Sequence, residues 1–208
     1  MPPESPSDAR HRLLDAAERL LREQGYEQVS VRAVNKAAGM NPAAVHYHFG
    51  SKQELVTALL ERRLRPLWDG GLTALEKRLE ADDPPEVTDL AVLLVEPMAR
   101  MAADPEHRWL LGLLARLVLA RHPLPWRSPW SAPGPWIAMI SRALPRLPAE
   151  VAAARWQLAR DLLLVTYGAP FAEPGTDVPP VPAETVVAFV AAGLGAPPTP
   201  EERTDGAR

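Results

Sequence analysis

The chain has 208 residues, of which 47% are hydrophobic, so it can bury a core without help from a metal or a disulfide. It contains no cysteine, which excludes thiol catalysis, a Cys-ligated zinc and a disulfide framework. Its N-terminus is polar, and no apolar run approaches the ~18 residues that cross a membrane. We therefore expect a soluble, cytoplasmic protein with no membrane partner.

The net charge of −3 by itself argues against a nucleic-acid partner, because phosphate binding requires an excess of Lys and Arg. The charge is unevenly distributed, however. Residues 1–65 carry ten Lys and Arg against eight Asp and Glu, whereas the rest of the chain carries thirteen against eighteen. Any contact with nucleic acid is expected in the N-terminal third.

Helical periodicity dominates the chain and no alternating β-branched run occurs, so the predicted fold class is all-α. The first helix is expected to follow Ser7 and to end at Gly25. A second, short helix follows Ser30 as its N-cap and ends at Gly39.

A third short helix is expected from Pro42 to about His48. The capping box Ser51–Glu54 then begins a fourth helix, which Pro66 and the pair at 70–71 should kink or end.

Five further helices are expected at roughly 85–103, 106–121, 135–146, 149–167 and 183–194. The segment 122–135, HPLPWRSPWSAPGP, excludes regular helix, but its tryptophans favour packing over the body as a lid. We divide the chain into a helix-turn-helix domain (1–50), a helical regulatory and dimerisation domain (51–196) and a disordered tail (197–208).

Two short helices joined by a tight Gly-containing turn, with a helix on either side, are typical of a helix-turn-helix. The second of the pair is short enough to dock in a major groove, where base edges are read. We expect Ser30 and Arg32 to contact phosphates, and Tyr47 and Lys52 to do so from the far side of the motif. The side chains expected to face base edges are Asn41, Ala43, Ala44 and His46. The alternative for Tyr47 and Lys52 is a solvated surface.

The stretch from Val31 to Leu55, VRAVNKAAGMNPAAVHYHFGSKQEL, closely resembles the DNA-binding signature of the TetR (tetracycline repressor) family. The matching positions are Tyr47, His48, Phe49, Gly50, Ser51, Lys52 and Leu55. The resemblance covers the first quarter to third of the chain, and Asn35 departs from the family's usual Ala or charged residue, which suggests a polar contact of its own. It implies a DNA-binding regulator, usually a repressor, that acts as a homodimer on a palindromic operator in double-stranded DNA.

The resemblance further implies that the last two long helices pair with their mates in a four-helix bundle. For any single residue there, an intrachain core is a serious alternative. The candidate dimer residues are Val151, Leu158, Leu162, Val165, Val187 and Val190.

The middle helices contain methionines and aromatic residues, which can line an apolar cavity or fill a core. The candidate ligand-binding residues are Met98, Met101, Trp109, Leu113, Trp136 and Met139. The segment around the fourth helix looks most like the branch of the family with fatty-acid-responsive regulators, which hints at an acyl-chain-like ligand. Such a ligand would move the heads off the ~34–36 Å spacing of two half-sites.

The sequence has no Gly-rich phosphate loop and no nucleophile elbow, which argues against an enzyme. His46 and His48 are two apart and would point in different directions on a helix, so neither a metal nor a cofactor is expected. A helical adaptor without DNA affinity is the remaining alternative.

Overall fold

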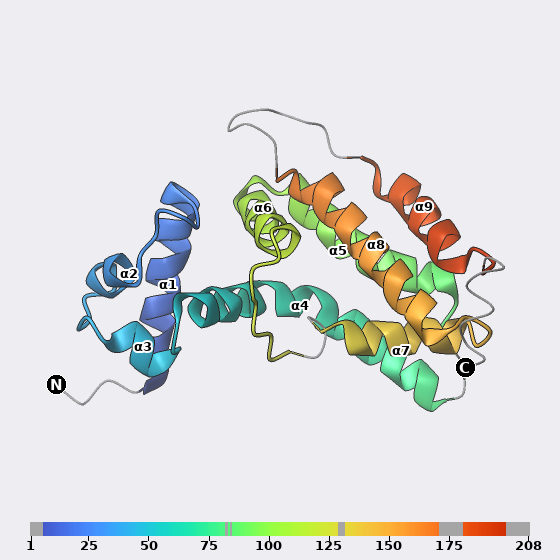
Figure 1. Cartoon of the computed structure of the whole chain (residues 1–208), viewed down its shortest axis with the longest axis horizontal. Helices are drawn as coiled ribbons and strands as arrows, with labels where there is room; N and C mark the ends of the chain where they lie inside the picture. Colours follow the sequence, from blue (N-terminus) through green and yellow to red (C-terminus); the bar gives the residue numbers. More distant parts are fainter. Residues whose placement is uncertain (1–5, 82, 84, 129–131, 171–180, 199–208) are drawn as a thin grey trace.

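The computed structural model describes residues 6–81, 83, 85–128, 132–170 and 181–198. Within these ranges the regular elements are helices, which confirms the predicted all-α class. Figure 1 shows a small, helical N-terminal head at one end and a larger helical body at the other. One long helix, α4 (Lys52–Glu80), leads from the head into the body.

The head consists of α1 (Pro6–Gln24), α2 (Val31–Ala37) and α3 (Ala44–His48). The Ser30 Oγ accepts a hydrogen bond from the Ala33 N–H at 3.1 Å, so the expected N-cap of α2 is confirmed. The third helix begins at Ala44 rather than at Pro42, because residues 42 and 43 form a turn instead of the first helical turn.

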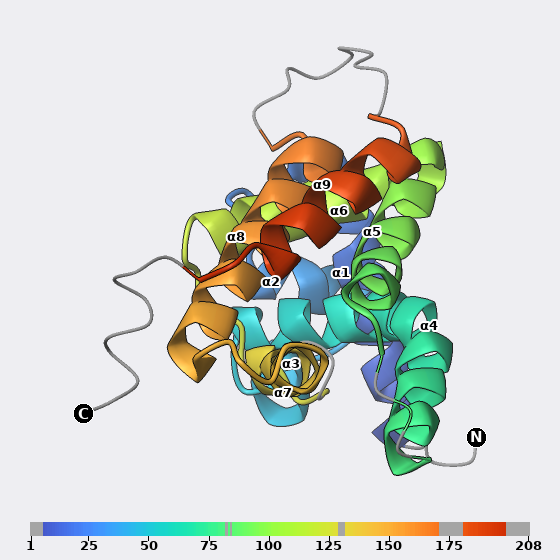
Figure 2. The same cartoon turned by 90° about the vertical axis from the view of Figure 1, so that its right-hand side faces the viewer.

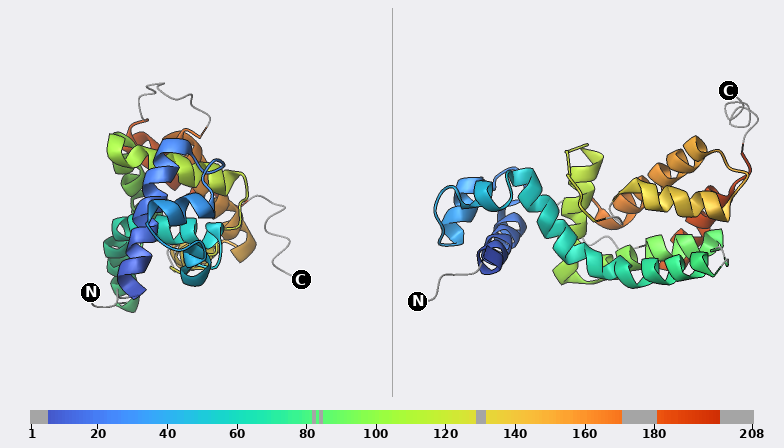
Figure 3. Two further views of the ribbon diagram at one scale, coloured as in Figure 1. Left: turned by 90° about the vertical axis from the view of Figure 1, so that its left-hand side faces the viewer. Right: turned by 90° about the horizontal axis from the view of Figure 1, so that it is seen from below.

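The capping box that begins α4 is present, with the Ser51 Oγ accepting from the Glu54 N–H at 3.1 Å. The helix continues through Pro66 and the two following glycines for 29 residues. Figure 3 shows that its direction changes along its length, so α4 bends and does not end there. Proline has no N–H to continue the helical hydrogen-bond ladder, which accounts for a bend at this position.

The body is built from α5 (Val87–Ala103), α6 (Pro105–Leu119), α7 (Pro133–Ala143), α8 (Ala149–Gly168) and α9 (Ala183–Gly195). Helix α8 packs against α6 and α7, while α9 lies over α5 and α8 (Figure 2). A Cβ on Gly168 would lie 2.5 Å from the Ala115 Cβ, so α8 and α6 approach closely at this glycine. No helix of the described ranges has the length and hydropathy to cross a membrane.

The segment that follows α6 crosses α4 on its way to α7 (Figure 1). Over residues 122–128 it lies at the junction of head and body, where Leu124 and Trp126 are partly buried against the core. Its role as a lid stays a prediction. The backbone N–H groups of Arg127 and Ser128 donate to the Glu61 Oε1 at 2.5 and 2.7 Å, and the His122 ring packs edge-on against Tyr26. An acceptor on α4 and a head aromatic thus hold the segment. Residues 129–131 and most of the expected tail, 199–208, lie outside the described residues.

Candidate nucleic-acid interface

Helix α3 presents one exposed face at the outer end of the head. Ala43, His46 and Tyr47 lie on it, because residues three and four apart share a helix face, and Tyr47 is 84% exposed. Ala44 and Val45 point the other way and are 3% and 0% exposed. The prediction that Ala44 faces base edges is therefore wrong, since α3 turns this methyl group into the head's core.

Asn35 is the residue that positions α3. It is 1% exposed, its Nδ2 donates to the Pro42 carbonyl at 2.6 Å, and its Oδ1 accepts from the Val45 N–H at 3.0 Å. One amide therefore bridges α2, the turn and α3, and its polar contact is made inside the protein. The departure from the family's usual residue at this position thus has a structural reason.

Two arginines of α1 brace the short helices at their C-terminal ends, where carbonyl groups lack helical partners. Arg10 donates to the His48 carbonyl at 2.9 Å and lies 4.1 Å from the centre of the Phe49 ring. Arg12 donates to the Ala38 carbonyl at 2.9 Å. Sequence reasoning missed both; the signal was two Arg residues close to the apolar residues of a helix that must pack on two short ones.

Lys52 is half-buried at the start of α4. Its ammonium donates to the Tyr26 carbonyl at 2.6 Å and lies 4.1 Å from the centre of the Tyr26 ring, and burial lowers the pKa of this lysine. The side chain thus ties α4 to the connection between α1 and α2. A phosphate contact by Lys52 stays a prediction.

The other predicted DNA contacts are solvent-exposed. Ser30 and Arg32 are exposed at the start of α2, and Asn41 is exposed in the turn, where its Oδ1 accepts from the Ala43 N–H at 2.9 Å. His46 is also exposed, and its Nδ1 lies 2.9 Å from the Gly50 carbonyl oxygen. The structure therefore brings Ala43, His46 and Tyr47 onto one surface and leaves Ser30 and Arg32 on the neighbouring helix. Their contacts with DNA stay predictions.

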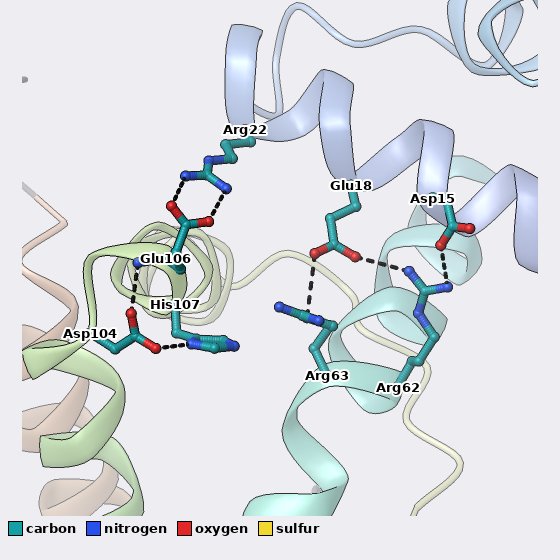
Figure 4. A network of polar contacts seen from close by, with 8 residues as sticks. All are labelled: Asp15, Glu18, Arg22, Arg62, Arg63, Asp104, Glu106 and His107. Carbon is teal, nitrogen blue, oxygen red and sulfur yellow. Dashed lines mark hydrogen bonds and ion pairs between the residues drawn. The ribbon is translucent and has the colours of Figure 1, made fainter.

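A network of charged side chains joins the head to the body (Figure 4). Arg22 of α1 makes a two-bond ion pair with Glu106 of α6, at 2.8 and 3.0 Å, and this pair lowers the pKa of Glu106. Arg62 of α4 contacts Asp15 at 2.7 Å and Glu18 at 2.9 Å on α1. Both α4 and α6 therefore hold α1. No group of three His, Cys, Asp or Glu in the described ranges is arranged to hold a metal.

The candidate ligand residues lie in the body's core rather than on its surface. Five of them are 7% exposed or less, and Trp109 is partly buried. Trp136 stacks on Trp156 with 5.0 Å between ring centres and an interplanar angle of 8°. Two buried polar atoms, the Trp156 Nε1 and the Tyr167 hydroxyl, have no hydrogen-bond partner in the described protein. A ligand pocket lined by the six predicted residues stays a prediction.

The predicted dimer residues divide into two groups. Val151 and Val190 are 9% and 3% exposed, so their assignment to an interface is wrong; they face neighbouring helices of the same chain. Leu158 and Val165 are 69% and 48% exposed, while Leu162 and Val187 are partly exposed. Sequence reasoning missed Phe189, which is 67% exposed on α9. Between α8 and α9 lies an apolar groove of about 330 Å³, whose lining includes Leu158, Leu162 and Phe189.

Comparison with known proteins gives matches for both the head and the whole chain. The family model described as "Bacterial regulatory proteins, tetR family" matches residues 13–59. The HTH-type transcriptional repressor AcnR of Corynebacterium efficiens is 29% identical over 130 residues, covering 57% of this chain and 68% of AcnR.

Two solved structures share the overall fold. The chain is similar to NalD of Pseudomonas aeruginosa, the secondary repressor of the MexAB-OprM multidrug efflux pump, with 22% identity, a TM-score of 0.60 and coverage of 90% of this chain and 97% of NalD. It is also similar to FadR of Bacillus halodurans, a fatty acid degradation regulator, with 17% identity, a TM-score of 0.56 and coverage of 90% and 95%. At these identities the likeness concerns the arrangement of the helices.

Proposed function

Because the chain belongs to the TetR family of DNA-binding transcriptional regulators, we propose that it is a homodimeric repressor that releases a palindromic operator on binding a small, mainly apolar molecule. Regulators of this family are not enzymes. The observation that carries the proposal is the exposed face of α3, where an 84% exposed tyrosine stands on a helix that buried polar contacts hold in place.

The exposed tyrosine makes sense as a phosphate contact. An aromatic ring left in water gains nothing for folding, whereas its hydroxyl on a rigid arm can donate to a phosphate beside the groove. Tyr47 packs edge-on against His48, with 5.0 Å between ring centres, which restricts the directions it can take.

The DNA test compares Tyr47→Ala and Tyr47→Phe by fluorescence anisotropy with operator DNA across a salt series. Both variants should weaken binding by about tenfold, since a hydrogen bond to a charged group contributes about 1.5–3 kcal/mol. Circular dichroism should show no change, because Tyr47 is outside the core. Unchanged affinity in both variants would remove Tyr47 from the DNA contact. No salt-sensitive binding of DNA by the parent protein would favour the helical adaptor.

The dimer part of the proposal is supported by the apolar surface of α8 and α9. Leu158 and Phe189, both about two-thirds exposed, border one groove, and large exposed apolar surfaces of this kind mark interaction sites. We propose that a second copy of the chain covers this groove, because a palindromic operator has two half-sites and each is bound by one head.

Placing negative charges on that apolar surface tests the dimer. Leu158→Asp together with Phe189→Asp should give a monomer in sedimentation velocity and should weaken operator binding, while circular dichroism stays unchanged. The control is Thr73→Asp, an exposed site on α4 away from the groove, which should remain dimeric. A double variant that stays dimeric would contradict this interface.

The ligand part is supported by the two orphan polar atoms in the apolar body. Buried polar groups are normally hydrogen-bonded, so the Trp156 Nε1–H and the Tyr167 hydroxyl are suited to a molecule that brings acceptors into an apolar environment. Both residues lie on the inner face of α8.

An acyl chain with a carboxyl end has this combination, so dodecanoate is the first probe. Dodecanoate should release the operator from the parent protein in the anisotropy assay, and Tyr167→Phe should need more of it. Release that is equal for the two proteins would remove Tyr167 from the ligand site. No release by dodecanoate, with DNA binding intact, would contradict an acyl-type ligand.

A further inference from the structure

We infer that His46 determines operator specificity as a hydrogen-bond acceptor, selecting a base that presents an amino group in the major groove, adenine or cytosine, at the position it faces. This inference rests on the proposed DNA-binding function and goes beyond it by naming the base chemistry that one side chain reads.

The hydrogen bond of the His46 ring fixes which nitrogen carries the proton. Its Nδ1 lies 2.9 Å from the carbonyl oxygen of Gly50. A carbonyl oxygen can only accept, so Nδ1 is the donor and carries the hydrogen. In the neutral imidazole the other nitrogen, Nε2, then has a free lone pair and no hydrogen.

The Gly50 carbonyl is itself held rigidly. Gly50 has φ +92°, a conformation that favours glycine, and its N–H is shared between the carbonyls of Val45 at 3.2 Å and His46 at 3.0 Å. A Cβ at Gly50 would lie 2.2 Å from the Glu54 Oε2, and Glu54 is held by Ser51 at the start of α4. The acceptor that orients the ring is therefore part of the turn that joins α3 to α4.

His46 is placed where a base edge would meet it. It is exposed and shares the outer face of α3 with Ala43 and Tyr47, opposite the fully buried Val45. Because the Nδ1 side of the ring faces the protein backbone, the Nε2 side is the one available to an outside partner.

The chemistry of the major groove then decides the preference. The amino groups of adenine and cytosine are the donors that base edges present there, whereas guanine presents N7 and O6 and thymine presents O4. A lone pair on Nε2 attracts an amino group and is repelled by those acceptors. Each base pair carries one amino group in the major groove, so His46 reads which strand carries it and distinguishes A·T from T·A.

The test begins with an operator selected from random DNA and measured by anisotropy at about pH 8, which is above the ordinary pKa of histidine. Each base pair is exchanged in turn for the parent protein and for His46→Ala. One adenine or cytosine should matter for the parent, with a loss of about threefold to tenfold on exchange, and should matter no longer for His46→Ala.

Base analogues then separate acceptance from donation at that position. If the base is adenine, purine, which lacks the amino group, should reduce affinity like a mismatch, while 7-deazaadenine, which lacks N7, should bind normally. For cytosine, 2-pyrimidinone serves as the analogue without the amino group. His46→Ala should bind each analogue and its parent base equally.

Two results would overturn the inference. One is a preference for guanine that 7-deazaguanine abolishes, because Nε2 would then be a donor; the other is an unchanged base preference in His46→Ala. Either result leaves the proposed function in place, since the parent protein still binds its operator. Failure of the parent protein to select any DNA would instead contradict the proposed function.

Discussion

The head of this protein and its body are each stabilised by different kinds of interaction. In the head, helices of five and seven residues have little surface to bury, and directed polar bonds from Asn35, Arg10 and Arg12 fix their orientation. In the body, helices of 11 to 20 residues pack through apolar faces, with two polar atoms left unpaired inside. The orientation of short helices therefore depends on directed hydrogen bonds, whereas the orientation of long helices follows from the packing of their apolar faces.

The comparison is tested most severely by Asn35→Leu. The change leaves the Pro42 carbonyl and the buried Val45 N–H without partners, and each unsatisfied group costs about 1–3 kcal/mol. Urea unfolding should show a loss of about 2–4 kcal/mol, and operator binding should be lost because α3 is no longer held. The neighbouring exposed Lys36→Ala is the control and should unfold like the parent. Equal stability of Asn35→Leu and the parent would mean that packing alone orders the head.

Gly168→Ala tests the close packing of helices in the body. The new methyl group would lie 2.5 Å from the Ala115 Cβ and 3.1 Å from the Leu111 carbonyl oxygen, so α6 and α8 must move apart. Overpacking of this kind costs about 1–3 kcal/mol, which thermal unfolding will detect. In Gly70→Ala, on α4, the methyl group meets nothing within 4 Å, and the variant should gain about 0.5–1 kcal/mol. A loss in both variants would point to a general intolerance of alanine rather than to close packing.

Tyr167→Phe tests whether a buried hydroxyl group contributes to the stability of the body. The hydroxyl is buried without a partner, and burial raises the pKa of Tyr167, so the neutral phenol is the buried form. Removing an unsatisfied hydroxyl should leave stability unchanged or raise it by up to about 1 kcal/mol in urea unfolding. A loss of stability would reveal a hydrogen-bond partner for the hydroxyl. The body would then depend on buried hydrogen bonds, as the head does.

The smallest effect is expected for the ion pair between the two regions. The pKa of Glu106 is lowered from 4.5, chiefly by the hydrogen bond from Arg22, so its contribution to stability is present above pH 4.5 and is lost as the pH falls below it. The thermal midpoints of Glu106→Gln and the parent should therefore differ slightly at neutral pH and converge in acid. The pair is exposed and weak, and added salt should also remove the difference. A difference that persists in acid would show that the carboxylate's charge is not involved.

Much of the head could be predicted because its signals are local. Ser30 caps α2 and Ser51 caps α4 through contacts with residues three positions away, and Gly39 and Gly50 have the positive φ values of 65° and 92° that end helices. The orientation of Ala44 could not be predicted, because helix positions turn by about 100° per residue and α3 begins at Ala44, later than the expected Pro42.

The body could be predicted as helices but not as surfaces. Helices α8 and α9 are apolar on more than one side and touch several neighbours, so the pattern does not say which side is covered within the chain. Val151 and Val190 therefore could not be separated from Leu158 and Val165. Phe189 could not be assigned to the surface from the sequence, because whether an aromatic side chain is exposed or buried depends on the surrounding fold.

The Glu61 contact at the crossing of α4 has a consequence for how this chain can change over generations. Its two donors are the main-chain N–H groups of residues 127 and 128, which every amino acid except proline supplies. Substitutions of either side chain other than to proline would keep these two hydrogen bonds, while loss of the one carboxylate would remove both of them. Relatives can therefore differ in the side chains at positions 127 and 128 and still keep this anchor, provided that position 61 keeps an acid.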